Sequence, residues 1–207
     1  MVIISPIVEY DIKNAGTAIF YDEGIIDKKR YDELLSMEKL QRNIQIGLMI
    51  KETPELSKIR SDGIKKAVEK FIAINKISNH NILEIANDAV WVVGRSVHKV
   101  HMSENIEFIK KQEFTSLFKY NKRMLIYLNS TTDTIKSRGF KIEKNEKLCD
   151  IIKEILNSYE YNDKDSMYEL CHETIANLKE DDLYYGSKFT EEITNASIIS
   201  KLMKDVL

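Results

Sequence analysis

The stretch that most limits what this chain can fold into is residues 81–94, N-I-L-E-I-A-N-D-A-V-W-V-V-G. Two runs rich in Ile, Leu, Val and Trp flank the polar pair Asn87-Asp88, and Gly94 closes the second run. β-Branched and aromatic residues favour strands, whereas Asn and Asp favour tight turns. The stretch therefore predicts a β-hairpin with Asp88 at its tip.

A second predicted strand, residues 2–10, also ends next to an acid. This run is apolar and extended, and Pro6 favours an edge position or a late start for the strand. Asp11 follows it, and from there apolar residues recur at helical spacing. Asp11 stands where a helix N-cap would, and turn formation is the corresponding structural interpretation of Asn87-Asp88. Each acid thus has a structural interpretation beside any chemical one.

The rest of the pattern predicts an α+β fold. Apolar residues recur at helical spacing in three segments before the hairpin, over about 27–36, 39–51 and 54–75. After the hairpin the period shifts toward two, which predicts an antiparallel meander of short strands at 105–108, 114–120, 124–129 and 134–136. From about residue 144 apolar stripes at helical spacing return. We therefore expect a domain over 1–143 with a helical insertion at about 27–76, followed by a helical region over 144–207.

Composition excludes several classes of protein. The chain is 43% hydrophobic and 31% charged, as is typical of folded rather than disordered proteins. No apolar run approaches the roughly 20 residues that cross a bilayer, and the start of the chain lacks a signal-peptide pattern. Cys149 and Cys171 form no metal-binding motif and indicate a reducing compartment, so a cytoplasmic location is expected. Phosphate-loop, dinucleotide-binding and serine-hydrolase motifs are all missing from the sequence.

The charge is distributed unevenly although the net charge is only −2. Residues 110–147 hold ten Lys and Arg against four Asp and Glu, whereas residues 148–207 hold six against thirteen. A basic middle segment suits a polyanion, and an ordinary solvated surface explains it equally well.

Two aspartates on neighbouring strands are enough to support metal-dependent phosphoryl transfer. Such a reaction needs a divalent cation that bridges the attacking group and the phosphate oxygens. Mg²⁺ takes one or two carboxylates and completes its shell with water and phosphate. If the two strands are neighbours, Asp11 and Asp88 form such a pair.

At this point the residues resemble a family. The string E-Y-D-I-K-N-A-G-T-A-I-F (9–20) resembles motif A of template-dependent nucleic-acid polymerases, in which a strand-end aspartate leads into a helix. The string I-L-E-I-A-N-D-A-V-W-V-V (82–93) resembles motif C, in which an aspartate sits at a hairpin tip. Residues 114–140 are similar to the basic strands that follow motif C in family B polymerases. The order of these strings and the helical segment between motifs A and C also match that family.

The resemblance implies an antiparallel palm-like sheet and a role for specific residues. Asp11 and Asp88 would be the catalytic residues and would hold Mg²⁺ or Mn²⁺. The nucleoside triphosphate would be bound by Arg60, Lys65 and Lys66 of the helix expected at 54–75. The nucleic acid would lie along the basic strands, at Lys119, Lys122, Arg123, Lys136 and Arg138.

The sequence departs from the polymerase pattern in two places. The hairpin tip reads Asn87-Asp88-Ala89, where family B has Asp-x-Asp, and the helical segment carries no clear counterpart of the fingers motif. The favoured interpretation is therefore a reduced or diverged palm-like nucleotidyltransferase. The small size and the Lys/Ile/Asn-rich composition suggest a phage or mobile-element protein, and a phage protein would act in the host cytosol. Two alternatives stay open: a non-catalytic binding or inhibitory module, either a single chain or an oligomer, in which the two acids are structural, and a subunit whose protein partner supplies the missing parts.

Overall fold

The structure is a computed structural model, and it describes residues 1–95, 97–121, 125–139, 142–143, 145–160, 165, 169, 183–184 and 193–206. The chain divides into two compact units. One comprises residues 8–111, and the other comprises residues 1–7 and 112–207. The expected domain limit between 143 and 144 stays a prediction.

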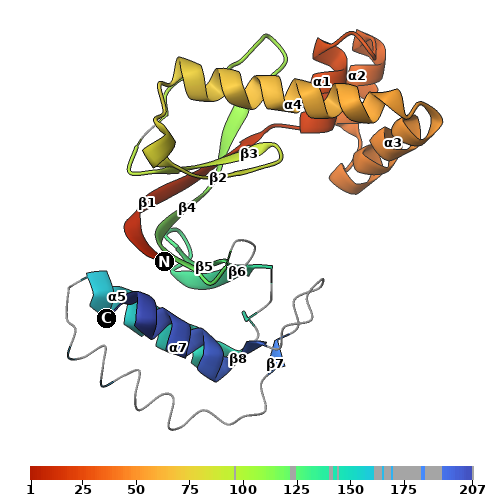
Figure 1. Ribbon diagram of the computed structural model, residues 1–207. Helices are drawn as coiled ribbons and strands as arrows, with labels where there is room; N and C mark the ends of the chain where they lie inside the picture. The colour runs from red at the N-terminus through yellow and green to blue at the C-terminus, as the bar shows by residue number, and fades with distance from the viewer. Residues whose placement is uncertain are drawn as a thin grey trace. The chain divides into compact units, whose positions relative to one another are not determined.

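The central element is a six-stranded antiparallel sheet in the order β2-β3-β1-β4-β5-β6 (Figure 1). Its strands are β1 (Val2–Ile12), β2 (Ile82–Ala86), β3 (Ala89–Val93), β4 (Phe108–Lys119), β5 (Leu125–Asn129) and β6 (Thr134–Arg138). A separate two-stranded ribbon pairs β7 (Leu183–Tyr184) with β8 (Ile193–Thr194). With the helices described next, the sheet confirms the predicted α+β class.

The helices lie close to where the sequence pattern places them. They are α1 (Ala15–Asp22), α2 (Lys28–Ser36), α3 (Lys39–Glu52), α4 (Glu55–Ile74), α5 (Glu146–Glu160) and α7 (Asn195–Val206), with a 3₁₀ turn at Asn79–Asn81. The helical pattern in the sequence around residues 167–178 falls almost wholly outside the described residues. None of the helices within the described ranges is long and apolar enough to cross a membrane.

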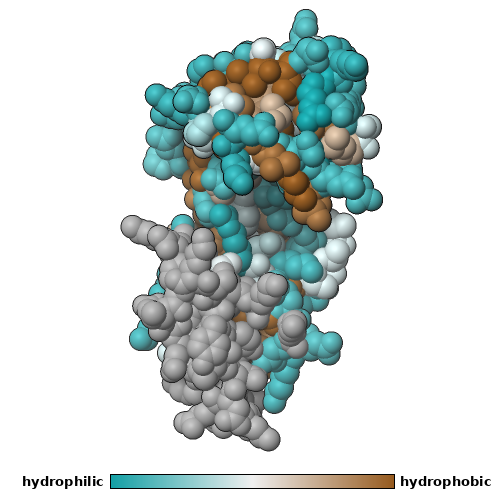
Figure 2. All heavy atoms as spheres, turned by 90° about the vertical axis from the view of Figure 1, so that its right-hand side faces the viewer, coloured by the Kyte–Doolittle hydropathy of each residue, from teal (hydrophilic) through white to brown (hydrophobic). Residues whose placement is uncertain are grey.

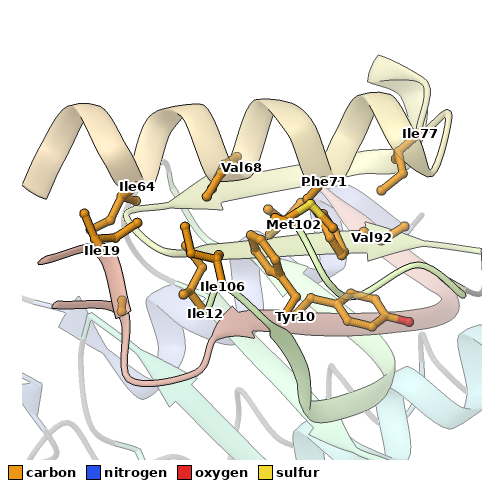
Figure 3. Close-up of a cluster of buried hydrophobic side chains, with 14 of the residues drawn as sticks. Tyr10, Ile12, Ile19, Ile64, Val68, Phe71, Ile77, Val92, Met102 and Ile106 are labelled. Atoms are coloured by element: carbon orange, nitrogen blue, oxygen red, sulfur yellow. The ribbon is translucent and has the colours of Figure 1, made fainter. Parts of the chain in front are cut away.

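In the unit of residues 8–111, helix α4 runs alongside the β2–β3 hairpin (Figure 1). Val68 and Phe71 of α4 point toward Tyr10 and Val92 of the strands in a buried cluster (Figure 3). Phe71 is fully buried and stacks on Phe108, with ring centroids 4.1 Å apart. This cluster fixes the hairpin against β1, and so it determines where the hairpin tip lies.

Gly63, in the middle of α4, lets two helices approach closely. A Cβ at this position would stand 2.5 Å from Cγ2 of Ile19 in α1. Any larger residue would push α1 away from α4, so glycine is required here despite its cost of about 1 kcal/mol in a helix.

Two expectations about the strands are wrong in detail. β1 runs on through Asp11 to Ile12, and α1 begins only at Ala15, so Asp11 does not cap a helix. Ile12 is buried, and its backbone N–H donates to the Asp88 carbonyl at 3.1 Å, which extends the strand. Furthermore, the strands expected at 105–108 and 114–120 are replaced by the single 12-residue strand β4. Polar residues in its middle made that strand look interrupted.

The other unit has a core of its own between its part of the sheet and two helices. One face of β5 and β6 packs on α5 and α7, through buried side chains that include Ile126, Leu128, Ile135, Ile152 and Leu202. Because side chains alternate across a strand, the strand residues next to Phe118, Ile126 and Ile135 of this core lie on the opposite face of the sheet. Lys119 follows Phe118, Lys136 follows Ile135, and Arg138 pairs with Leu125, the residue before Ile126.

Candidate metal and nucleotide site

The two aspartates singled out from the sequence lie next to each other. Asp11 is the penultimate residue of β1, and Asp88 is the second residue of the two-residue turn that joins Ala86 to Ala89. The hydrogen bond from Ile12 N–H to the Asp88 carbonyl ties the strand end to the hairpin tip. Asn87 takes the left-handed conformation of the turn, with φ of 56°. Together, the hydrogen bond and the turn place the side chain of Asp88 near that of Asp11.

The two carboxyl groups act on each other electrostatically. Asp88 is half-buried, and burial, followed by the negative charge of Asp11, raises the pKa of Asp88 above its ordinary value. A hydrogen bond with Asp11, available only when a proton is shared, raises it further, while Lys111 works in the opposite direction. Oδ1 of Asp11 is buried and meets no donor among the described residues. A divalent cation would relieve this repulsion and satisfy that oxygen.

Lys111, a residue that was not predicted from the sequence, forms an ion pair with Asp11. It extends from β4, and its Nζ lies 2.8 Å from Oδ2 of Asp11 and 3.2 Å from Oε1 of Glu9. Burial acts to lower the pKa of Lys111, but its bonds to Asp11 and Glu9 outweigh burial, so the pKa is raised. The group is therefore a full positive charge at neutral pH.

The acid pair opens into a cavity of about 590 Å³ with a basic lining. Helix α3 contributes Lys39, Arg42 and Asn43, and α4 contributes Arg60. Lys13 and Lys111 also line the cavity, so its lining contains five basic and two acidic side chains in all. The excess of positive charge in this lining suits an anionic ligand.

The polar residues of α3 that line the cavity were not predicted, because an apolar stripe dominates the sequence pattern of this helix. Lys39, Arg42 and Asn43 are three and four positions apart, which places them on one helical face. That spacing was visible in the sequence as K-x-x-R-N. Lys39 forms no ion pair with any residue of the described ranges, and the same holds for Arg60.

The three basic residues predicted to bind a nucleotide do not all line one cavity. Arg60 lines the cavity of the acid pair, and it also lines a neighbouring cavity of about 580 Å³ between α4 and the hairpin. Lys65 lines only this second cavity, and it pairs with Glu69 at 3.9 Å. Lys66 pairs with Glu23 of the α1 end at 3.3 Å. Only Arg60 is placed beside the two aspartates.

The residues predicted to bind nucleic acid belong to the other unit. Lys119 and Arg138 are both in register with Leu125 of β5, and Lys136 is in register with Tyr127. Directly paired residues share a face of a sheet, so the three cations lie on the face opposite α5 and α7. Lys122 and Arg123 lie outside the described residues.

The side chains present fit a magnesium-type ion bound by few protein ligands. Within the described part of the chain, no group of three or more His, Cys, Asp or Glu side chains could hold a metal. A cation at Asp11 and Asp88 would take its remaining ligands from water and from phosphate, as Mg²⁺ does at nucleotide sites.

The sequence profile of the family described as "Bacteriophage PBS1 gene 130 protein" matches residues 3–205. Among curated proteins none matches the chain.

Proposed function

This chain belongs to the bacteriophage PBS1 gene 130 protein family, and we propose that it is a palm-like, metal-dependent nucleotidyltransferase that acts on nucleic acid in the host cytosol. Asp11 and Asp88 would bind Mg²⁺ or Mn²⁺, and the basic cavity beside them would bind the triphosphate. The proposal goes beyond membership of a phage family, which by itself names no activity.

The observation that supports it most is the position of Asp88. A turn aspartate normally points into solvent, where its charge costs nothing. Asp88 is instead half-buried beside a second carboxylate, at a cost that its raised pKa expresses. Perturbed carboxylates in a cavity often mark functional sites. A bound divalent cation is the partner that turns this repulsion into attraction.

The cavity lining supports a phosphate ligand. Lys39 and Arg42 of α3 and Arg60 of α4 surround the acid pair from the helical side. Arg groups bind phosphate oxygens through two parallel hydrogen bonds, and Lys adds a point charge. A triphosphate in this cavity would therefore be held between these cations and a metal on the two aspartates.

Each group has a defined task in the proposed reaction. The metal, when bound, would neutralise charge on the phosphate and favour deprotonation of the attacking hydroxyl. Asp11 and Asp88 would hold that metal at the junction of β1 and the hairpin tip. Arg42 and Arg60 orient the phosphates and offset their charge as the bond to the leaving group breaks.

Nucleic acid would be held by the basic face of the sheet in the other unit. Lys119, Lys136 and Arg138 share the sheet face that α5 and α7 do not cover. Contacts of this kind bind the phosphate backbone without reading sequence, and they weaken as salt rises.

The first test is Mn²⁺ binding by calorimetry. The wild type is compared with the Asp11→Asn, Asp88→Asn double variant and with Asp62→Asn, Asp133→Asn, which removes the same charge at exposed positions. We expect binding to be lost only in the first variant, with circular dichroism unchanged. Primer extension should follow the same pattern. Equal binding by all three proteins, or none by the wild type in the presence of nucleoside triphosphate and primer–template, would refute the proposal.

A separate observation favours the alternative of a module that acts through protein contacts. The apolar stripe of α3 is exposed: Leu40, Ile44 and Leu48 have exposed fractions of 71%, 52% and 45%. Hydrophobic side chains interrupt the hydrophilic surface in the view that faces this end of the unit (Figure 2). Exposed apolar patches often mark interfaces. A homo-oligomer through α3 predicts a solution mass above one chain that falls to one chain in Leu40→Ser, Ile44→Ser, Leu48→Ser.

A further inference from the structure

Lys111 links the candidate metal site to a third acid. Its Nζ bridges Asp11 and Glu9, which are two residues apart on β1 and so lie on the same face of the strand. The side chain of Glu9 is only 7% exposed and that of Asp11 is 19% exposed, whereas that of Lys111 is 46% exposed. The ammonium group therefore reaches inward from a partly exposed stem to two largely buried carboxylates.

In this arrangement a metal that binds Asp11 must compete with Lys111. Oδ2 of Asp11 already binds the lysine at 2.8 Å, so a metal at the other oxygen, Oδ1, would stand beside a like charge. The geometry points to Lys111 as a resident counter-cation, which occupies Asp11 in the metal-free protein and must be displaced when metal binds. This inference rests on the proposed function, because it takes Asp11 and Asp88 as the metal ligands.

Glu9 determines where the lysine goes when it is displaced. Its ion pair with Glu9, 3.2 Å between Nζ and Oε1, does not involve Asp11, so Lys111 can keep this contact when it releases Asp11. Lys111 also lines the cavity that holds Arg42 and Arg60. The released ammonium thus stays at the edge of the phosphate-binding cavity. Nucleotide phosphate can then take the place of Asp11 as its partner.

The exchange makes metal and triphosphate bind cooperatively. Metal alone must break the Lys111–Asp11 ion pair without replacing it. When a metal binds together with a triphosphate, the phosphate oxygens can bind the same lysine in place of Asp11. Wild-type protein should therefore bind Mn²⁺ more tightly when a non-hydrolysable nucleoside triphosphate is present, and part of that gain should depend on Lys111.

The test compares Mn²⁺ calorimetry of the wild type, Lys111→Met and Lys110→Met, with and without the non-hydrolysable triphosphate. Lys110 is the matched control, since it is the residue of β4 just before Lys111 and points to the opposite face. We expect Lys111→Met to bind Mn²⁺ alone about tenfold more tightly than the wild type, as the loss of a charged hydrogen bond that competes with the metal implies. The gain from added triphosphate should shrink, and Lys110→Met should match the wild type.

The outcomes separate the two proposals. If the wild type binds Mn²⁺ but Lys111→Met binds it equally or more weakly, Lys111 is not a competing cation and this inference is wrong, while the metal site stands. If neither protein binds Mn²⁺ under any condition, the proposed function fails and this inference fails with it. Lys111→Gln, which keeps a hydrogen-bond donor, gives the same comparison if Lys111→Met does not fold.

Discussion

The turns of two hairpins in this molecule contain similar residues, but these residues have different roles. The β2–β3 turn carries Asn87 and Asp88, and the β5–β6 turn spans residues 130–133 and ends in Asp133. Both contain a residue in the left-handed region, Asn87 with φ of 56° and Asp133 with φ of 50°. The sequence alone offers the same structural interpretation of both turns. Their surroundings distinguish a turn residue from a candidate functional one.

The β5–β6 turn is stabilised by its own side chains. Oδ1 of the buried Asn129 accepts hydrogen bonds from the backbone N–H groups of Thr131 and Thr132, both at 3.0 Å. The side chain of Asp133 is 71% exposed and pairs with Lys153 of α5. Every acid and amide in this turn has a local structural task.

The β2–β3 turn divides its two residues between two tasks. Asn87 supplies the backbone conformation, which Asn tolerates better than most residues. Asp88 needs no unusual backbone angle, and its carboxyl lies half-buried beside Asp11. Burial next to a like charge, and not residue type, therefore marks Asp88 as a candidate metal ligand.

The largest expected effect on stability comes from the structural turn. Asn129→Ala removes the acceptor of two backbone N–H groups at a buried position, so we expect a loss of about 1–2 kcal/mol in the free energy of unfolding. Urea unfolding followed by circular dichroism measures it. Asn129→Asp keeps the acceptor and should lose less. Equal losses in the two variants would show that the turn does not depend on this oxygen.

Local pattern was enough to predict the elements but not their ends. The hairpin follows from alternating β-branched residues around Asn87-Asp88, and its strands occur where that pattern places them. Asp11 resembles a helix cap in the sequence, so β1 was predicted to end before it. Its continuation depends on the hydrogen bond from Ile12 N–H to the carbonyl of Asp88, a residue 76 positions further along the chain. Long-range pairing overrode local propensity there.

The candidate site was predictable in its acids and not in its cations. Asp11 and Asp88 each stand at the end of a recognisable strand, so sequence reasoning could pair them. Lys111 faces Asp11 only because β4 lies beside β1 in the sheet. Its role depends on a contact between residues 100 positions apart, which no local pattern records.

A smaller effect, with the opposite sign, is expected at the hairpin tip. The pKa of Asp88 is raised in the folded protein, so folding is favoured when Asp88 is protonated and is penalised as the pH rises through that pKa. Asp88→Asn removes the penalty and keeps a turn-forming residue. We therefore expect the variant to be more stable than the wild type at pH 7.5, by less than about 1 kcal/mol because the group is only half-buried.

The pH dependence of this gain identifies its cause. Below the ordinary value of 3.8, Asp88 is protonated in both the folded and unfolded states, so the advantage of Asp88→Asn should vanish. Urea unfolding in the presence of a chelator, at pH 7.5 and at the lowest pH at which both proteins fold, provides the measurement. A variant that is less stable than the wild type at pH 7.5 would mean that Asp88 serves the turn after all.

The smallest effect is expected at the other aspartate. Asp133→Asn removes an ion pair with Lys153 in which the Asp133 side chain is 71% exposed, and such pairs contribute about 0–1 kcal/mol that salt screens further. Asn also tolerates the left-handed conformation that residue 133 adopts. We expect a loss of stability below about 0.5 kcal/mol in low salt, no measurable loss in high salt, and unchanged Mn²⁺ binding. If Asp133→Asn instead weakened Mn²⁺ binding as much as Asp88→Asn, the two turns would not differ in function, and burial beside Asp11 would lose its meaning as a marker of the metal site.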